Sequence, residues 1–263
     1  MKYLRFGILS MALLLSAHSM VAGTIGPDAF GYTASNAAYG FIDITGSGTR
    51  ILVASDDDTQ SGVPLGFNFS FYGQSYTETC VGANGLVAFN GCEPGNPPVN
   101  FATTATFNDT PVIAPLNADW QFFNGAGDST PDAVYYATTG APGSRQFIVQ
   151  WNQAYSYPNS PKSVTFELIL NESSNLIQFE YLNVDSGDGN AFGGVAAIGI
   201  RDTGGDQNGN ALMWSFSGST PITGESAVQF SSTPASTSTP EPGTMFGMVT
   251  GLMVLGLARL KLK

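Results

Sequence analysis

Residues 164–181 read VTFELILNESSNLIQFEY, and this stretch decides the fold class. Apolar side chains occupy alternate positions before and after the polar residues 171–175. The first set is Val164, Phe166, Leu168 and Leu170, and the second is Ile177, Phe179 and Tyr181. A period of two places each set on one face of a β-strand, so the stretch predicts a β-hairpin with one buried face.

Glu167 and Glu180 lie between the apolar residues of this hairpin. Because successive side chains of a strand point to opposite faces, we expect both glutamates to face the solvent. Together with Asp119 they are candidate carboxylates for glycoside hydrolysis, which uses a pair of such groups. Their expected exposure on an ordinary solvent-facing surface argues against that role.

Similar short apolar runs, bounded by turn residues, recur along the chain. They cover residues 51–54, 67–71, 86–89, 112–116, 133–137, 146–151, 195–200, 212–216 and 227–230. About ten short antiparallel strands with such turns predict an all-β, β-sandwich-like ectodomain over residues 24–230. The 32 Gly, the 15 Pro and the 11% of charged residues exclude a mainly helical domain.

The net charge of −11 is distributed unevenly. Lys2 and Arg5 precede the first apolar run, and Arg259, Lys261 and Lys263 follow the last one. The residues between them hold all 20 acidic side chains against four basic ones, a net charge of −16. A surface this acidic repels nucleic acid and anionic lipid, so we expect no nucleic-acid partner.

The one histidine, His18, lies in the first apolar region. Removal of that region as a signal peptide leaves a mature protein without histidine. This excludes Ser-His-Asp and Cys-His catalysis, and every zinc site that needs an imidazole. We therefore expect a protein that is not an enzyme.

Residues 1–23 predict a signal peptide for export through the Sec translocon. Lys2 and Arg5 are basic, and residues 6–17 form an apolar region too short to be a comfortable membrane span. Small residues then allow cleavage after Ser19 or Gly23. An uncleaved N-terminal anchor is the alternative.

The C-terminus has three parts. Residues 231–239 form a Ser/Thr/Pro linker, Pro240, Glu241 and Pro242 follow, and an apolar segment occupies residues 243–260. At 1.5 Å per residue this segment would extend about 27 Å, close to the roughly 30 Å apolar core of a bilayer. We predict one transmembrane helix here, with Arg259, Lys261 and Lys263 kept on the cytoplasmic side.

Pro-Glu-Pro before a short apolar helix and a basic tail resembles the PEP-CTERM sorting signal of Gram-negative bacteria. The resemblance implies processing by an exosortase, an integral-membrane protease, and a role with exopolysaccharide in biofilms. It implies a precursor anchored in the inner membrane and a mature protein at the cell surface or in the extracellular matrix. A plain C-terminal anchor is the alternative.

Five segments of the central part resemble the nidogen-like extracellular β domain of bacterial surface proteins. They are residues 64–73, 82–89, 113–120, 166–181 and 197–202. One departure is that Asn117 stands where family members usually place Trp, and Trp120 follows later. The resemblance implies an adhesion or matrix role and gives no catalytic residues. A carbohydrate-active hydrolase and a structural matrix protein without a specific ligand are the alternatives.

Cys80 and Cys92 are the two cysteines of the chain. Export places them in an oxidising compartment, so we predict one disulfide across the Asn84-Gly85 turn. A redox or metal-binding pair is the alternative.

Two stretches place oxygen ligands around glycines and are candidate Ca²⁺ sites, although neither matches an EF-hand loop. Their ligands are Asp185, Asp188 and Asn190 in one stretch, and Asp202, Asp206 and Asn208 in the other. Ordinary turns are the alternative, and we expect no cofactor other than this calcium. Asp56, Asp57 and Asp58 form a charged run, which is typical of a solvated loop.

Aromatic side chains near residues 151–161 are a candidate platform for sugar rings of an extracellular polysaccharide. Tyr155 and Tyr157 are the surface candidates, whereas we expect Trp151 to pack in the core.

Overall fold

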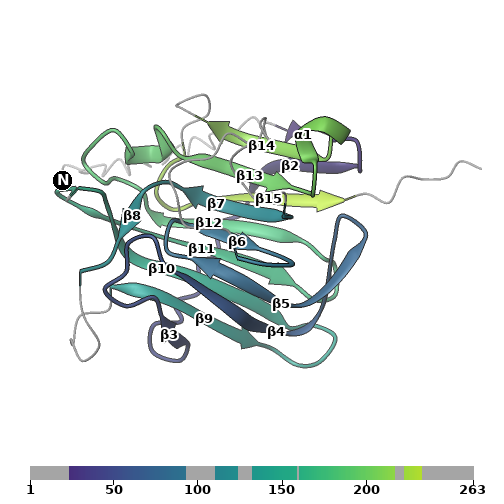
Figure 1. The fold of residues 1–263 in the computed structure, drawn as a ribbon, viewed down its shortest axis with the longest axis horizontal. Coiled ribbons are helices and arrows are strands. Elements are labelled where there is room, and N and C mark those ends of the chain that lie inside the picture. The colour runs from purple at the N-terminus through teal and green to yellow at the C-terminus, as the bar shows by residue number, and fades with distance from the viewer. Residues whose placement is uncertain (1–23, 93–109, 124–131, 159, 217–221, 233–263) are drawn as a thin grey trace, which may run out of the picture.

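The fold consists of two antiparallel sheets that face each other (Figure 1). The computed structural model describes residues 24–92, 110–123, 132–158, 160–216 and 222–232. Within these ranges, two short helical turns lie between strands: the 3-10 helix η2 (Ala191–Gly193) and α1 (Gly205–Asn208). The all-β, sandwich-like class predicted from the sequence is confirmed.

The larger sheet has nine strands, and eight of them form one continuous row. In spatial order the row is β1 (Thr24–Ile25), β2 (Tyr32–Ala37), β15 (Ser226–Ser232), β12 (Ile177–Asn183), β11 (Ser163–Asn171), β10 (Gln146–Ser156), β9 (Ala133–Thr139) and β3 (Thr49–Ile51). The ninth strand, β8 (Trp120–Gln121), pairs with the end of β10. The predicted hairpin is β11 and β12, and β15 continues two residues into the predicted linker.

The smaller sheet has six strands. In spatial order they are β14 (Ala211–Phe216), β13 (Ala197–Arg201), β7 (Val112–Asn117), β6 (Leu86–Ala88), β5 (Gln74–Gly82) and β4 (Thr59–Phe71). The two sheets enclose a core in which large aromatic side chains are fully buried, among them Trp120, Trp151, Phe166 and Phe179. The indole of Trp151 stacks on Phe166, and its Nε1 donates to the Gly82 carbonyl across the core, 2.9 Å away.

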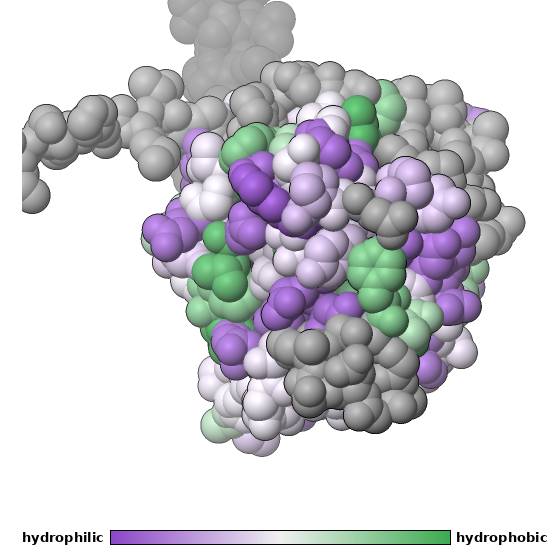
Figure 2. Space-filling model, turned by 90° about the vertical axis from the view of Figure 1, so that its left-hand side faces the viewer, coloured by the Kyte–Doolittle hydropathy of each residue, from purple (hydrophilic) through white to green (hydrophobic). Residues whose placement is uncertain are grey.

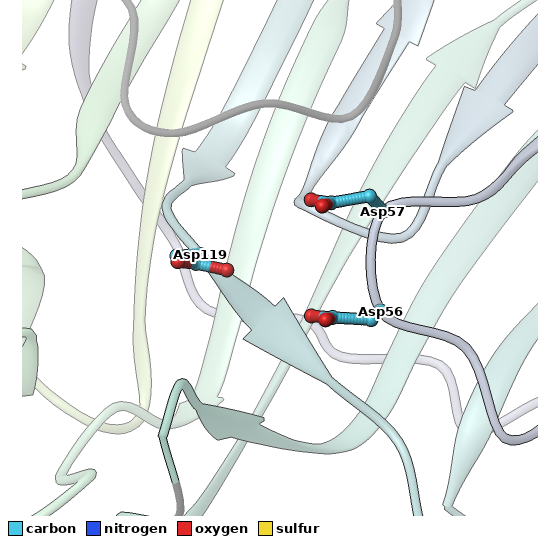
Figure 3. A group of neighbouring side chains, drawn as sticks. All are labelled: Asp56, Asp57 and Asp119. Atoms are coloured by element: carbon cyan, nitrogen blue, oxygen red, sulfur yellow. The ribbon is translucent and has the colours of Figure 1, made fainter.

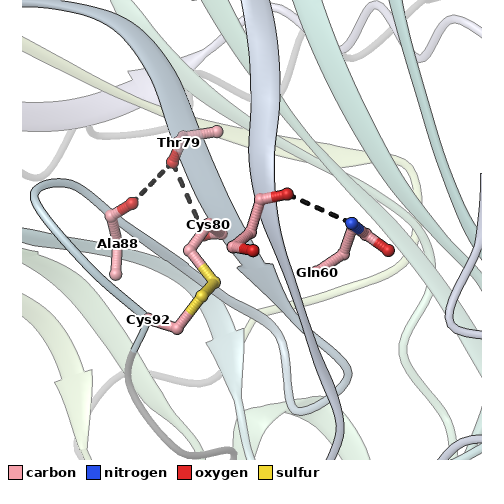
Figure 4. The surroundings of a disulfide bond; sticks show 6 residues. Gln60, Thr79, Cys80, Ala88 and Cys92 are labelled. Carbon is pink, nitrogen blue, oxygen red and sulfur yellow. Dashed lines mark hydrogen bonds between the residues drawn. A yellow bond between two sulfur atoms is a disulfide. The ribbon is translucent and has the colours of Figure 1, made fainter.

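The disulfide between Cys80 and Cys92 is present, as predicted (Figure 4). Cys80 lies on β5 opposite Ala88 of β6, and Cys92 follows that strand. Beside it, the Thr79 hydroxyl donates to the Ala88 carbonyl at 2.7 Å. The bridge therefore fixes the chain that leaves β6 to the strand with which β6 pairs.

The prediction that Glu167 and Glu180 face the solvent is wrong. Both side chains point away from the core, yet they are 0% and 1% exposed. The reason is an irregular segment, residues 38–44, which we call the strap. Its backbone amides at Gly40 and Ile42 donate to the carboxyl groups of Glu180 and Glu167. The strap thus forms a third layer over part of the larger sheet.

Candidate functional site

Three carboxylates meet at the end of the sandwich where β8 lies (Figure 3). Asp56 and Asp57 belong to the loop before β4, and Asp119 belongs to the turn between β7 and β8. One oxygen of each lies within 4.8 Å of the others, and the side chains point toward one another. The sequence predicts a solvated loop at residues 56–58, and nothing in its local pattern indicates that this loop lies beside Asp119.

Asn84, in the turn between β5 and β6, connects the two halves of this group. Its side chain is fully buried. Its Nδ2 donates to Asp57 Oδ1 at 3.0 Å, while its Oδ1 accepts the Trp120 amide at 2.7 Å. Its carbonyl also accepts the Asn117 side-chain amide at 2.7 Å. One asparagine therefore positions the loop that holds Asp57 and the turn that holds Asp119.

Backbone hydrogen bonds hold the same segments from their other sides. The Phe122 amide donates to the Ser55 carbonyl at 2.7 Å, and the Tyr157 amide donates to the Asp119 carbonyl at 2.9 Å. The first bond holds the acidic loop against the segment after β8. The second holds Asp119 against the residue that follows β10. The carboxylates are therefore presented by a cross-connected group of turns.

Gly85 allows the turns to approach so closely. Its φ is +73°, and a Cβ atom at this position would lie 2.1 Å from the Leu116 carbonyl oxygen. Any side chain would push the β5–β6 turn away from β7. The Asn84-Gly85 pair thus combines a hydrogen-bonding side chain with a residue that leaves room for β7.

The electrostatics of the three carboxylates are unfavourable to full ionisation. Partial burial raises the pKa of Asp119, and the charges of Asp56 and Asp57 add to this. Burial, followed by the charges of Asp57 and Asp58, raises the pKa of Asp56. Three carboxylate oxygens could hold a hard cation, but calcium takes about six to eight oxygens, so these groups alone are an incomplete site.

Aromatic side chains surround this end of the molecule. Phe123 and Tyr157 are 49% and 52% exposed. Tyr155 is half-buried and contacts the Phe123 ring, with 5.1 Å between ring centroids. Trp151 is fully buried in the core, as expected. Figure 2 looks onto this end and shows separate hydrophobic areas beside hydrophilic ones.

The first predicted calcium stretch forms the turns that lead into η2. The Asp185 carboxylate forms an ion pair with Lys162. Asp188 Oδ1 accepts the Ser186 hydroxyl at 2.6 Å and the Asn190 amide at 2.9 Å. The Asn190 side chain donates to the Ser156 hydroxyl. The carboxylate oxygens of Asp185 and Asp188 thus have local partners, whereas Asn190 Oδ1 is buried without a hydrogen-bond partner. Ca²⁺ binding here is still a prediction.

The second predicted stretch surrounds α1. The Asp202 amide donates to the Asn210 carbonyl at 2.9 Å. Asn208 Oδ1 accepts the Asn210 amide at 2.9 Å, and its Nδ2 donates to the Thr203 carbonyl. The side chain of Asp206 lies outside the described part of the structure. Calcium binding at this stretch stays a prediction.

The predicted sorting residues lie outside the described residues. They are Pro240, Glu241, Pro242, Arg259, Lys261 and Lys263, and the predicted signal peptide and transmembrane segment lie outside as well. Within the described ranges, no helix has the length and apolarity needed to cross a membrane.

Comparison with known proteins finds a family model that matches most of the chain. The family model described as NIDO related matches residues 31–246 of the chain. No curated protein and no solved structure matches the chain. The matched region includes both sheets apart from β1, and it includes the three carboxylates and the disulfide.

Proposed function

The chain belongs to the NIDO-related family, and on this premise we propose that it is an exported surface or matrix protein with a non-catalytic adhesion role. The aromatic and acidic end of the sandwich would contact an extracellular polysaccharide. The placement of this end supports the proposal most directly. It lies where β10 ends and β8 pairs, whereas the chain leaves β15 at the opposite end of the same sheet.

The two ends of the sequence support export and sorting. The basic and apolar residues 1–23 have the pattern of a Sec signal peptide. Pro240, Glu241 and Pro242, the apolar residues after them and the basic tail have the order of a PEP-CTERM signal. An exosortase-type membrane protease would process the anchored precursor and release it to the cell surface or extracellular matrix of a Gram-negative bacterium.

The disulfide supports the same compartment. Structural disulfides persist in oxidising spaces outside the cytoplasm, and Cys80 is only 5% exposed on a strand of the core. The 16 negative charges in excess between residues 6 and 258 also suit a soluble extracellular body.

The arrangement of aromatic rings supports carbohydrate as the ligand class. Exposed rings such as Phe123 and Tyr157 offer flat apolar faces, and Asp119, whose carbonyl accepts the Tyr157 amide, offers carboxylate acceptors for hydroxyl groups. Because Asp56 and Asp57 add negative charge here, we expect a neutral polysaccharide rather than an acidic one.

A hydrolase is the second candidate, and Asp119 is the observation that favours it. Its raised pKa and its position beside two other carboxylates are features of a glycosidase acid. Glu167 and Glu180 do not offer such a pair to a substrate, since the strap covers them.

Polysaccharide from the native host separates the two candidates. We expect the purified protein to cosediment with it and to release no reducing ends. Phe123→Ala and Tyr157→Ala should weaken cosedimentation, whereas Tyr39→Ala, which removes an exposed ring from the strap, should not. Release of reducing ends that Asp119→Asn abolishes would favour the hydrolase instead.

Sorting is tested in the native host with the full-length protein. Replacement of Pro240, Glu241 and Pro242 by Ala should leave the protein in the inner membrane with its C-terminus intact, while the wild-type protein reaches the surface and loses it. Pro234→Ala in the linker is the matched control and should behave as wild type. An unchanged C-terminus and location in the triple variant would contradict exosortase processing.

A further inference from the structure

The strap is held by one acceptor side chain from each of three neighbouring strands. The amides of Gly40, Ile42 and Ile44 donate to Glu180 of β12 at 2.9 Å, to Glu167 of β11 at 2.8 Å and to Gln150 of β10 at 2.8 Å. The strand register places Gln150 opposite Glu167, and Glu167 opposite Glu180. Alternate amides of the strap therefore bind along one row of side chains across the sheet.

Apolar contacts close one end of the strap. Ile44 is 1% exposed and belongs to a small cluster with Tyr135, Ile148 and Ile169 on the outer face of the larger sheet. Ile42 packs against the same cluster. The strap therefore shields both apolar and polar side chains of this face from water.

The two carboxyl groups in the row are buried side by side. Directly opposed residues of antiparallel strands have Cβ atoms about 4.5–5.5 Å apart, so the ends of Glu167 and Glu180 can reach each other. Glu167 Oε1 accepts the Ile42 amide, but its Oε2 is buried without a hydrogen-bond partner. A buried carboxylate oxygen without a donor is costly, and a proton on that oxygen would remove the cost.

The titratable groups around the pair include no adjacent cation among the described residues. Two of them, Asp43 and Tyr39, lie on the strap, and the charge of Glu225, in the turn before β15, affects Tyr39. On the sheet, the strand register places Tyr135 of β9 opposite Gln150, and Arg50 of β3 opposite Tyr135. The charges that act on Glu167 are those of Glu180 and Asp43, and both are negative. The surroundings therefore favour a protonated carboxyl group over a second carboxylate.

We propose that Glu167 and Glu180 share one proton in the folded protein and that this proton keeps the strap closed. The Glu167 carboxylic acid donates its O–H to the Glu180 carboxylate. When a base from the solvent removes the proton, two adjacent carboxylates remain, and their repulsion and need for water detach the strap. The device is thus an alkaline-sensitive latch on the outer face of the larger sheet.

The electrostatics agree with this geometry. Burial, and then the charges of Glu180 and Asp43, raises the pKa of Glu167 to about 8 against the opposing hydrogen bond from Ile42. Burial also raises the pKa of Glu180, although its hydrogen bond from Gly40 opposes the shift. The proton would therefore be present at neutral pH and lost at mildly alkaline pH.

Hydrogen exchange of the purified protein tests the latch. Protection factors of the Gly40, Ile42 and Ile44 amides, corrected for the intrinsic pH dependence of exchange, are followed from about pH 6 to about pH 10. We expect strap protection to fall by up to about tenfold per pH unit as the pH rises toward about 8 and to level off above it, while the Leu168 amide in β11 stays more strongly protected than the strap throughout.

Two variants define the source of the change. Glu167→Gln keeps the acceptor for Ile42 and replaces the acid with an amide that can donate to Glu180, so its strap should stay protected at every pH. Glu172→Gln, in the half-buried pair with Arg145 far from the strap in sequence, should follow the wild-type decline. Constant strap protection in wild type, or a wild-type decline in Glu167→Gln, would overturn the proposal.

If the Glu167→Gln variant does not fold, infrared spectroscopy of the wild-type protein still detects the proton directly. The C=O stretch of a protonated carboxylic acid should be present at about pH 7 and disappear by about pH 10 while the β-sheet signal remains. Absence of this C=O band at neutral pH would overturn the proposal that the two glutamates share a proton.

Discussion

The Trp120 amide donates to the Asn84 side-chain oxygen at 2.7 Å, and this bond joins two turns far apart in the sequence. Trp120 is fully buried, and its Nε1 donates to the Leu116 carbonyl at 2.8 Å, so the tryptophan cannot move independently of its turn. Because Asn84 also binds Asp57, a single buried side chain determines where the acidic loop lies relative to Asp119.

Replacing Asn84 by Ala should therefore loosen this end of the molecule. The change leaves the Trp120 amide buried without its acceptor, which costs about 1–3 kcal/mol of unfolding free energy. Denaturant titration measures the loss. Asn36→Ala, at an exposed position of β2, is the matched control and should change stability by less than about 0.5 kcal/mol. Equal effects of the two substitutions would contradict the role of Asn84.

Gly85→Ala should be more damaging than an alanine at another glycine with positive φ. At Gly85 the new Cβ would clash with the Leu116 carbonyl at 2.1 Å, in addition to the strain of the left-handed backbone. Gly143 has φ +88° and open space around it, so Gly143→Ala should cost only about 1–2 kcal/mol of backbone strain. Thermal unfolding of both variants tests the comparison, and a smaller loss for Gly85→Ala would refute the close approach.

Asp119→Asn should stabilise the protein in metal-free buffer at neutral pH. It removes one of three mutually repelling carboxylates, and relief of such repulsion near a surface is worth about 0.5–1 kcal/mol. Asp58→Asn is the comparison, because it removes an exposed charge that lies beside the three-carboxylate group and repels Asp56 without belonging to that group. We expect a rise in the unfolding temperature for Asp119→Asn that exceeds the change for Asp58→Asn. A lower unfolding temperature would show that the repulsion is already compensated.

The disulfide should contribute about 3 kcal/mol to stability, because it closes a loop with a sequence separation of 12. Cys80→Ser combined with Cys92→Ser should lose this amount in denaturant unfolding. Wild type under a reductant should approach the double variant, while the variant itself should not respond to reductant. A wild-type stability that is the same with and without reductant would contradict this estimate.

Stability should depend on pH in two opposite ways. The pKa of Glu167 is raised from 4.5 to about 8 in the folded protein. Its contribution to the free energy of unfolding is therefore full below pH 4.5 and is lost as the pH rises toward 8. The slope for one proton is at most about 1.4 kcal/mol per pH unit. The Arg145 hydrogen bonds lower the pKa of Glu172 to about 2, so its contribution is present above pH 4.5 and is lost as the pH falls toward 2.

We therefore expect greatest stability at mildly acidic pH and a decline from there toward pH 8. Denaturant unfolding at a series of pH values measures both limbs. Glu167→Gln should flatten the alkaline limb and leave the acid limb, and Glu172→Gln should do the reverse. A stability maximum at alkaline pH in wild type would exclude a neutral Glu167 in the folded state.

Strand alternation made the central hairpin predictable. Its inward set, which includes Phe166 and Phe179, is strictly periodic and fully buried. Strand β5 could not be predicted, because its sequence QSYTETCVG contains few apolar residues. Its position between β4 and β6 is set by strand pairing, which local periodicity does not reveal. Strand β2 buries only Tyr32 and Ala34 deeply, which leaves little periodic signal.

The candidate site and the strap depend on contacts that no local pattern encodes. Asp57 and Asp119 meet because β5, β6 and β7 are neighbours in the smaller sheet, a property of topology. The glutamates of β11 and β12 have an ordinary alternating pattern, and their burial results from hydrogen bonds to residues more than 100 positions away. Prediction from the sequence therefore identified these carboxylates individually but not their surroundings.

The position of β15 determines how this body would respond to being pulled. Its last residue, Ser232, pairs with Tyr32 of β2, and on its other side β15 is bonded to β12, so the exit strand is clamped between two antiparallel neighbours. Tension between the Asp119 end and a tether at Ser232 would run along the strand axes. Such a load shears many backbone hydrogen bonds at once instead of unzipping them one by one, which is the geometry that gives a sheet its greatest mechanical resistance.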